Sequence, residues 1–168
     1  MIIMIIYAII SFLLDGFVSN YTGINIVNPS YLRTIYSLVS LVIIYNYFEN
    51  DKKYLYLLFC LGIFFDIVYT NTPLLNIFIF FVIFIVLKQL DYIIPNNILT
   101  INIKSLICIS IYHTMSYFIL VLVAYHNYPI NLLTKILSRS IIMTIIYSTI
   151  SYLIIKKIYF NKYDKKIK

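Results

Sequence analysis

The sequence predicts an all-α fold, a polytopic membrane protein built as a bundle of six transmembrane helices. Of its 168 residues, 62% are hydrophobic and 11% are charged, whereas soluble domains are about 45–50% apolar and about 25% charged. The apolar residues form blocks close to the roughly 20 residues that a helix needs to cross a bilayer. The blocks are apolar throughout, which excludes a membrane β-barrel, because barrel strands alternate apolar and polar residues.

The first three predicted helices are each set off by their flanking residues. Ile2 to Val18 is apolar from its start, with no basic residue before it and no small-residue cleavage site after it. We therefore expect a retained helix rather than a removable signal peptide. Tyr31 to Phe48 follows a stretch that contains Gly23, Pro29 and three asparagines, which are turn residues. Tyr54 to Thr70 follows a charged stretch and ends before a proline.

The last three predicted helices complete one membrane domain. Leu74 to Leu90 resumes directly after that proline, and Ile103 to Tyr125 and Leu132 to Ile155 are separated by a polar stretch that contains another. Proline and asparagine between apolar runs mark loops. The sequence therefore predicts an integral membrane domain over residues 1–157 and a basic tail over residues 158–168.

The distribution of basic residues predicts the orientation. With both termini in the cytoplasm, ten basic residues lie on the inner side, and only Arg33, Lys135 and Arg139 lie outside. An excess of lysine and arginine marks cytoplasmic loops, so both termini are predicted to be cytoplasmic. The net charge of +7 arises largely at the C-terminal end, which favours contact with anionic lipid over nucleic acid. The candidate lipid contacts are Lys156, Lys157, Lys162, Lys165, Lys166 and Lys168.

Two acids and two bases are predicted at similar depth in the outer half of the membrane. A charge in hydrocarbon is costly, so such residues usually face protein and pair with one another. Gly62 lies one helical turn before Asp66 on the same face, where the missing side chain lets a second helix approach. We therefore expect a polar cluster of Asp66, Gly62, Arg139, Asp15 and Arg33 that sets helix packing. The alternative for Asp15 and Arg33 is a water-exposed position at the membrane interface.

Small hydroxyl residues recur at helical spacing on the sixth and second segments. In lipid, helices associate through close packing and hydrogen bonds, so such residues mark where helices meet. The candidate packing face comprises Ser140, Thr144, Ser148 and Ser37, and we expect the second and sixth helices to offer docking surfaces for a partner helix. The stretch from Asn76 to Leu87 is uniformly bulky, and we expect it to face lipid.

No catalytic signature is present, so the sequence predicts neither an enzyme nor a bound cofactor. His113 lies near the middle of the fifth segment, where a histidine could serve a proton relay or a metal site. We favour the interpretation that His113 is a hydrogen-bonded packing residue, because metal sites need several convergent ligands. Cys60 and Cys108 fall inside apolar runs, and we expect both to be core residues.

One motif carries a resemblance. The third segment closes with Gly-x-x-x-Asp-x-x-Tyr-Thr, at Gly62, Asp66, Tyr69 and Thr70, and an apolar continuation follows at Leu75 and Phe80. In this pattern the chain resembles the rod shape-determining protein MreD family. Three further residues agree, together with the lysine-rich tail: Asp15 ends the first helix, Pro29 opens the second and Arg139 lies early in the last. The chain departs from the family pattern at Asn71-Thr72-Pro73, where a glycine is common.

The resemblance implies a non-catalytic scaffold in the bacterial inner membrane. Proteins of this family work with MreC, the actin-like MreB, RodA and a class B penicillin-binding protein in cell elongation and peptidoglycan synthesis. The implied fold is similar to the substrate-binding subunits of energy-coupling-factor vitamin transporters. The alternative function is therefore a small-molecule transporter subunit with an outward pocket near Asp66 and Arg139. The sequence leaves open whether the protein forms a homodimer.

Overall fold

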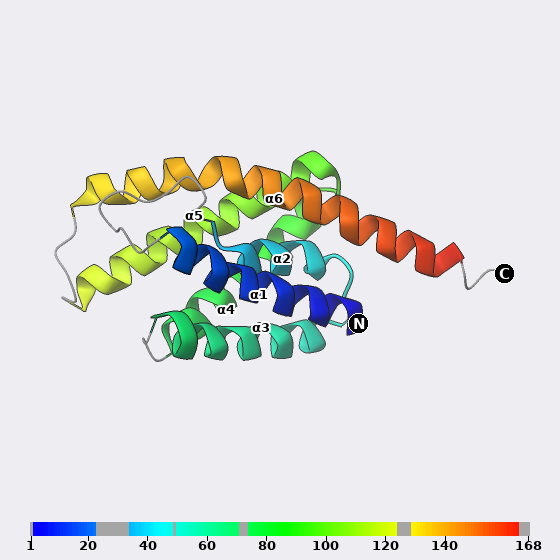
Figure 1. Cartoon of the computed structure of the whole chain (residues 1–168), viewed down its shortest axis with the longest axis horizontal. Coiled ribbons are helices and arrows are strands. Elements are labelled where there is room, and N and C mark those ends of the chain that lie inside the picture. The colour runs from blue at the N-terminus through cyan, green and yellow to red at the C-terminus, as the bar shows by residue number, and fades with distance from the viewer. Residues whose placement is uncertain (1, 23–33, 49, 71–73, 124–128, 165–168) are drawn as a thin grey trace.

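The computed structural model describes residues 2–22, 34–48, 50–70, 74–123 and 129–164 (Figure 1). All regular structure within these ranges is helical. The elements are α1 (Ile2–Thr22), α2 (Tyr36–Tyr45), α3 (Asp51–Phe65), a π-helical turn η1 (Asp66–Thr70), α4 (Leu75–Ile93), α5 (Ile98–Leu122) and α6 (Ile130–Asp164). The prediction of an all-α chain is confirmed for the described residues.

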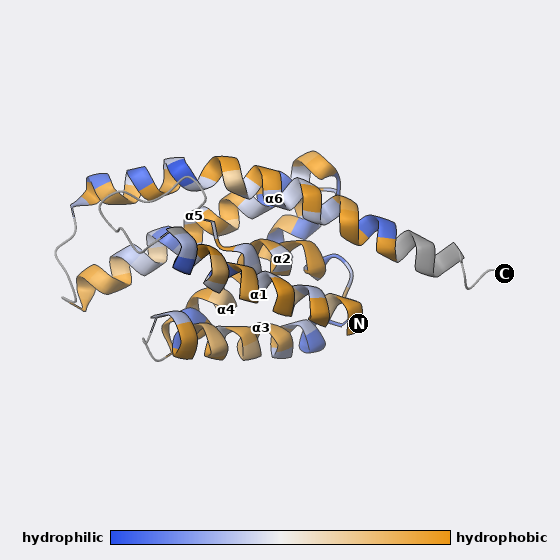
Figure 2. Cartoon of the chain, viewed as in Figure 1, coloured by the Kyte–Doolittle hydropathy of each residue, from blue (hydrophilic) through white to orange (hydrophobic). Residues whose placement is uncertain are grey.

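Five of the helices are long and apolar enough to cross a membrane, as in a multi-pass membrane protein. These spans are α1, α3 with η1, α4, α5 and α6, with lengths of 19 to 29 residues. Apolar residues predominate along them, and hydrophilic residues gather towards several of their ends (Figure 2). The start of α1 and the end of α6 lie at the same end of the bundle (Figure 1). This arrangement agrees with termini on one side of the membrane.

The structure corrects the second predicted helix. Residues 31–48 are apolar enough to span, but α2 has only 10 residues. At 1.5 Å per residue it is about 15 Å long, about half of the bilayer's hydrocarbon thickness. Nine consecutive residues of α2 are buried, and the helix packs against α1, α5 and α6. Short helices and irregular backbone are tolerated at membrane depth where protein surrounds them, so α2 serves as the centre of the bundle.

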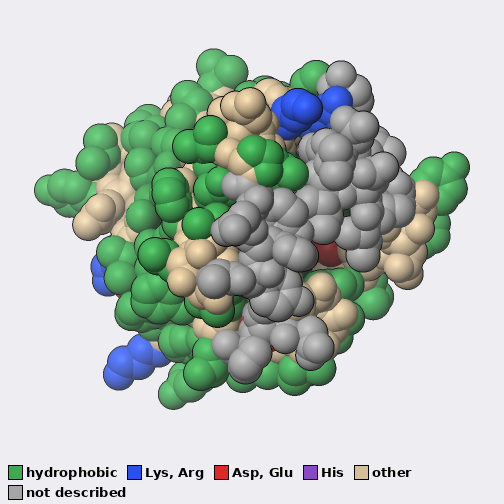
Figure 3. Space-filling view, turned by 90° about the vertical axis from the view of Figure 1, so that its left-hand side faces the viewer, with side chains coloured by type: hydrophobic (Ala, Val, Ile, Leu, Met, Phe, Trp, Pro, Cys, Tyr) green, Lys and Arg blue, Asp and Glu red, His purple; other side chains and the backbone are tan. Residues whose placement is uncertain are grey.

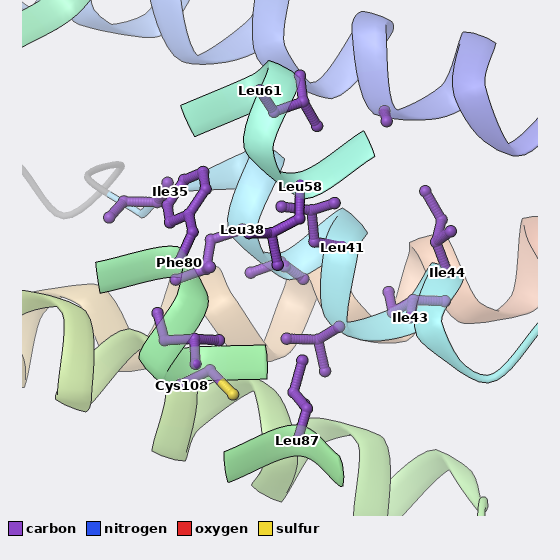
Figure 4. Close-up of a cluster of buried hydrophobic side chains, with 14 of the residues drawn as sticks. Ile35, Leu38, Leu41, Ile43, Ile44, Leu58, Leu61, Phe80, Leu87 and Cys108 are labelled. Atoms are coloured by element: carbon purple, nitrogen blue, oxygen red, sulfur yellow. The ribbon is translucent and has the colours of Figure 1, made fainter. Parts of the chain in front are cut away.

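The core forms around α2. Leu38 and Leu41 lie among Leu58 of α3, Phe80 of α4 and Cys108 of α5 (Figure 4). All five side chains are no more than 1% exposed, so α2, α3, α4 and α5 share one buried core. The expectation that both cysteines are core residues is correct for Cys108 and wrong for Cys60, which is exposed on α3.

Helix α4 has one buried face, contrary to the expectation that it faces lipid. The buried residues recur at helical spacing: Asn76, Ile79, Phe80, Ile83, Phe84 and Leu87. Large apolar side chains on the other side, among them Phe78, Phe81 and Ile85, are exposed. The two faces carry similar residues, so the hydropathy pattern could not distinguish them.

Helix α6 continues beyond the predicted end of the membrane domain. It runs to Asp164 as one helix of 35 residues, which is about 52 Å at 1.5 Å per residue. No break occurs at residue 157, so the start of the predicted tail is helical.

Candidate functional site

The carboxylate of Asp66 caps the N-terminus of α4 from the preceding turn. Its Oδ1 accepts a hydrogen bond from the backbone N–H of Asn76 at 3.0 Å and from the Asn76 side-chain amide at 2.8 Å. The residue in the N-cap position, Leu74, has no side chain that could do this. The first N–H groups of a helix lack intrahelical partners and carry partial positive charge. Asp66 supplies the missing cap, and the helix end stabilises its buried carboxylate.

The cap extends to a third helix through Asn76. The Asn76 amide also donates to Thr70 Oγ1 at 2.9 Å, and its Oδ1 accepts a hydrogen bond from the Tyr112 hydroxyl of α5 at 2.6 Å. Asp66 is 5% exposed and Asn76 is fully buried. The four residues thus connect η1, α4 and α5 by hydrogen bonds inside the bundle. Asn76 and Tyr112 were not singled out from the sequence, because both lie within long apolar runs.

Local backbone geometry brings Asp66 to this position. A Cβ on Gly62 would lie 3.1 Å from the Ile77 Cα, so glycine permits the close approach of α3 and α4. Asp66 begins the π-helical turn η1, which is wider than an α-helical turn and is often found at functional sites. Leu74 has a positive φ of 67°, a strained conformation for a side-chain-bearing residue. The wide turn of η1 and the positive φ of Leu74 thus flank the carboxylate on either side in the sequence.

Asp15 plays the same role at the N-terminus of α2. Its two oxygens accept hydrogen bonds from the backbone N–H groups of Tyr36 and Ser37, at 2.7 and 2.9 Å. The N-cap residue, Ile35, is again apolar. In both cases an acidic residue near the end of one helix caps the next helix. An apolar N-cap after a loop, preceded by an acid late in the previous helix, is the sequence signal that could have revealed this arrangement.

Both carboxylates bond the N-terminus of the helix that follows their own. Among the described residues, their hydrogen bonds come from backbone N–H groups at these helix ends and from neighbouring polar side chains. A helix end offers fixed N–H donors, whereas a long basic side chain must be ordered first. Arg139 is half-buried on α6, and Arg33 lies outside the described residues. Asp15 and Asp66 therefore cap two different helices, with Gly62 supporting the cap of Asp66, and the expected pairing with bases stays a prediction.

Tyr69 joins the Asp66 cap to α1. Its hydroxyl donates to the carbonyl oxygen of Phe12 at 2.7 Å, and its ring packs against Phe12 with centroids 4.8 Å apart. A Cβ on Gly16 would lie 2.7 Å from this hydroxyl. The last residues of the Gly-x-x-x-Asp-x-x-Tyr-Thr motif therefore hold η1 against α1.

The hydroxyl face of α6 contacts this chain's own helices. Ser140, Thr144, Ser148 and also Ser37 of α2 are at most 2% exposed. Thr144 bonds Thr34 at 2.7 Å, and Ser148 donates to Asn102 of α5. The expectation that Ser37 and Ser148 dock a partner helix is wrong, since both are enclosed by the bundle.

Lys104 forms a buried ion pair that the sequence analysis counted only as an inner-side charge. Its Nζ donates to Asp91 Oδ1 at 2.8 Å and to Asn96 Oδ1 at 2.7 Å, and the residue is 1% exposed. The pair connects the end of α4 to the start of α5. A second pair, between Lys88 and Asp51 at 2.8 Å, is exposed and joins α4 to α3.

The remaining candidate residues stand apart from the caps. His113 is half-buried on α5 beside the Tyr112 ring, and no group of three potential metal ligands occurs among the described residues. Lys156 and Lys157 are exposed on α6. Lys162 lies in α6 but its side chain is not described, and Lys165, Lys166 and Lys168 lie outside the described residues.

Comparison with profiles of known protein families, with curated protein sequences and with solved structures finds no match.

Proposed function

We propose that the protein is a non-catalytic membrane scaffold of the bacterial cell-elongation machinery, similar to the MreD family. In this proposal it lies in the inner membrane with both termini in the cytoplasm. Its partners are an MreC-like protein, MreB, RodA and a class B penicillin-binding protein.

One observation supports the proposal above the others. The residues of the motif behind the resemblance together connect α3 and η1 to α4 and α1. Gly62 allows close approach, Asp66 caps α4, Tyr69 bonds α1, and Thr70 accepts a hydrogen bond from Asn76. These four residues are of types far less common in apolar helices than leucine or isoleucine, and each of them has a packing role here. A motif of this kind fits a protein whose task is to hold a defined shape.

The use of the intramembrane polar groups also favours a scaffold. Ionisable residues inside a membrane are functional candidates by default. Here Asp15 and Asp66 are committed to helix ends, and Lys104 is committed to Asp91. Side chains bound in this way rigidify the bundle, which suits a platform that positions other proteins.

Co-purification tests the proposal directly. The tagged full-length protein is extracted in mild detergent, and the proteins that accompany it are identified by mass spectrometry. A tagged, unrelated multi-pass protein from the same membrane is the control. We expect enrichment of an MreC-like protein and of wall-synthesis enzymes. Enrichment of a transport ATPase instead would support the transporter alternative.

Cysteine labelling tests the proposed orientation. Cys60 and Cys108 are first replaced by serine, and single cysteines are then introduced at Asn50, Thr22 and Tyr128. With both termini cytoplasmic, a membrane-impermeant reagent added to intact spheroplasts labels positions 22 and 128 and leaves position 50 unlabelled. Labelling at position 50 alone would show that both termini lie outside the cytoplasm.

A further inference from the structure

One end of the bundle carries lysines in excess of the acids beside them. This basic end comprises the start of α3, the end of α4, the start of α5 and the exit of α6. The acids at this end whose side chains are described, Asp51 and Asp91, are ion-paired with Lys88 and Lys104. The exposed lysines that remain are Lys52, Lys53, Lys156 and Lys157. Among the described side chains, these four lysines form no ion pair.

The position of Lys156 and Lys157 along α6 sets their depth. The stretch from Ser140 to Ile155 contains no charged residue over 16 residues, which is about 24 Å of helix. The Lys156 and Lys157 ammonium groups lie beyond the end of this charge-free length, because the flexible side chain of lysine reaches towards the membrane interface. The resulting length is close to the roughly 30 Å hydrocarbon thickness. Both lysines therefore lie at the level of lipid headgroups.

The surroundings of the two lysines fit a headgroup site. The Lys156 Nζ lies 5.7 Å from the centre of the Tyr152 ring, and tyrosine is enriched at membrane interfaces. In Figure 2 the ribbon of α6 changes from apolar to hydrophilic at this point. Figure 3 views the opposite end, where basic side chains are few among the described residues in view.

We propose that Lys156 and Lys157, at the exit of α6, bind the phosphate of an anionic phospholipid. Two adjacent ammonium groups without an acidic partner from the described part of the chain match a lipid that carries net negative charge. A zwitterionic lipid carries a cationic group beside its phosphate, so it gains less binding free energy from the two lysines. The proposal does not depend on the scaffold function, since a transporter subunit could bind the same lipid.

Native mass spectrometry of the full-length protein in detergent tests the proposal. The protein is titrated with phosphatidylglycerol or with phosphatidylcholine of the same acyl chains. A lysine near an anionic surface contributes about 1 kcal/mol. We therefore expect Lys157→Gln to weaken phosphatidylglycerol binding about fivefold, and the double variant K156Q/K157Q to weaken it about thirtyfold. High salt should reduce the difference between the two lipids.

Lys135→Gln is the matched control, since Lys135 is also an exposed lysine of α6 but lies near its start. We expect this variant to bind phosphatidylglycerol like the unchanged protein. Equal losses for Lys135→Gln and Lys157→Gln would overturn the proposal, as would equal binding of the two lipids. An acidic peptide that binds the lysines in phosphatidylcholine nanodiscs, while phosphatidylglycerol shows no preference, would assign this surface to a protein instead.

Discussion

Substitutions of Asp66 distinguish the contribution of its hydrogen bonds to the N-terminus of α4 from the contribution of its negative charge. Asp66→Leu removes the acceptor for the backbone N–H and side-chain amide of the fully buried Asn76. An unsatisfied buried N–H costs about 1–3 kcal/mol, and the amide, which keeps Thr70 as a partner, loses about 0.5–1.5 kcal/mol. The sum is about 1.5–4.5 kcal/mol. This is a large fraction of the roughly 5–15 kcal/mol by which folded proteins are stable.

Asp66→Asn retains the acceptor. Both hydrogen bonds from Asn76 end on Oδ1, while Oδ2 is buried and has no hydrogen-bond partner. An asparagine carbonyl can replace Oδ1, so the main loss is the favourable interaction of a negative charge with the helix N-terminus, about 0.3–1 kcal/mol. Asp66→Lys should be the worst of the three, because it places a buried cation beside the positive end of α4.

Equilibrium unfolding in mixed micelles of mild detergent and dodecyl sulfate, followed by circular dichroism, measures these differences. We expect the free energy of unfolding to decrease in the order unchanged protein, Asp66→Asn, Asp66→Leu and Asp66→Lys. If Asp66→Asn loses as much stability as Asp66→Leu, the carboxylate acts through its charge and the capping account is wrong.

Three further substitutions test the other contacts of the caps by the same measurement. Gly62→Leu should lower the free energy of unfolding by about 3 kcal/mol through overpacking against the Ile77 backbone; wild-type stability would show that α3 and α4 are further apart. Gly16→Ala should displace the Tyr69 hydroxyl and should cost at least about 0.5 kcal/mol less in a Tyr69→Phe background; strict additivity would contradict this contact. Asp15→Ala should cost about 2–4 kcal/mol, because the first two N–H groups of α2 lose their acceptors; a neutral result would mean that water or another group caps α2.

The general architecture could be predicted from the sequence because it depends on hydropathy and chain reversal. Long apolar blocks separated by proline and asparagine yield membrane helices whatever their partners are. The shortness of α2 could not be predicted, since an apolar run reads the same whether it faces lipid or is enclosed by protein. The buried face of α4 could not be predicted for the same reason. Phe80 and Phe81 have the same hydropathy, but only Phe80 is buried.

The candidate site could be predicted only in part. Asp66 and Gly62 were identified because a carboxylate and a glycine are conspicuous in an apolar helix. The helix N-terminus that Asp66 caps was not predicted, since a base is visible in a sequence as a counter-charge and a helix N-terminus is not. Asn76 lies ten residues after Asp66, and hydropathy gives no sign that the two side chains meet.

Depletion of the protein in the cells that encode it tests the proposed scaffold function most directly. Cell width and length are measured by microscopy as the protein is lost, with re-expression of the unchanged chain as the control. We expect rod-shaped cells to widen and round up, and we expect no nutrient to restore their shape. Cells that keep their shape but stop growing until a small molecule is added to the medium would contradict this expectation.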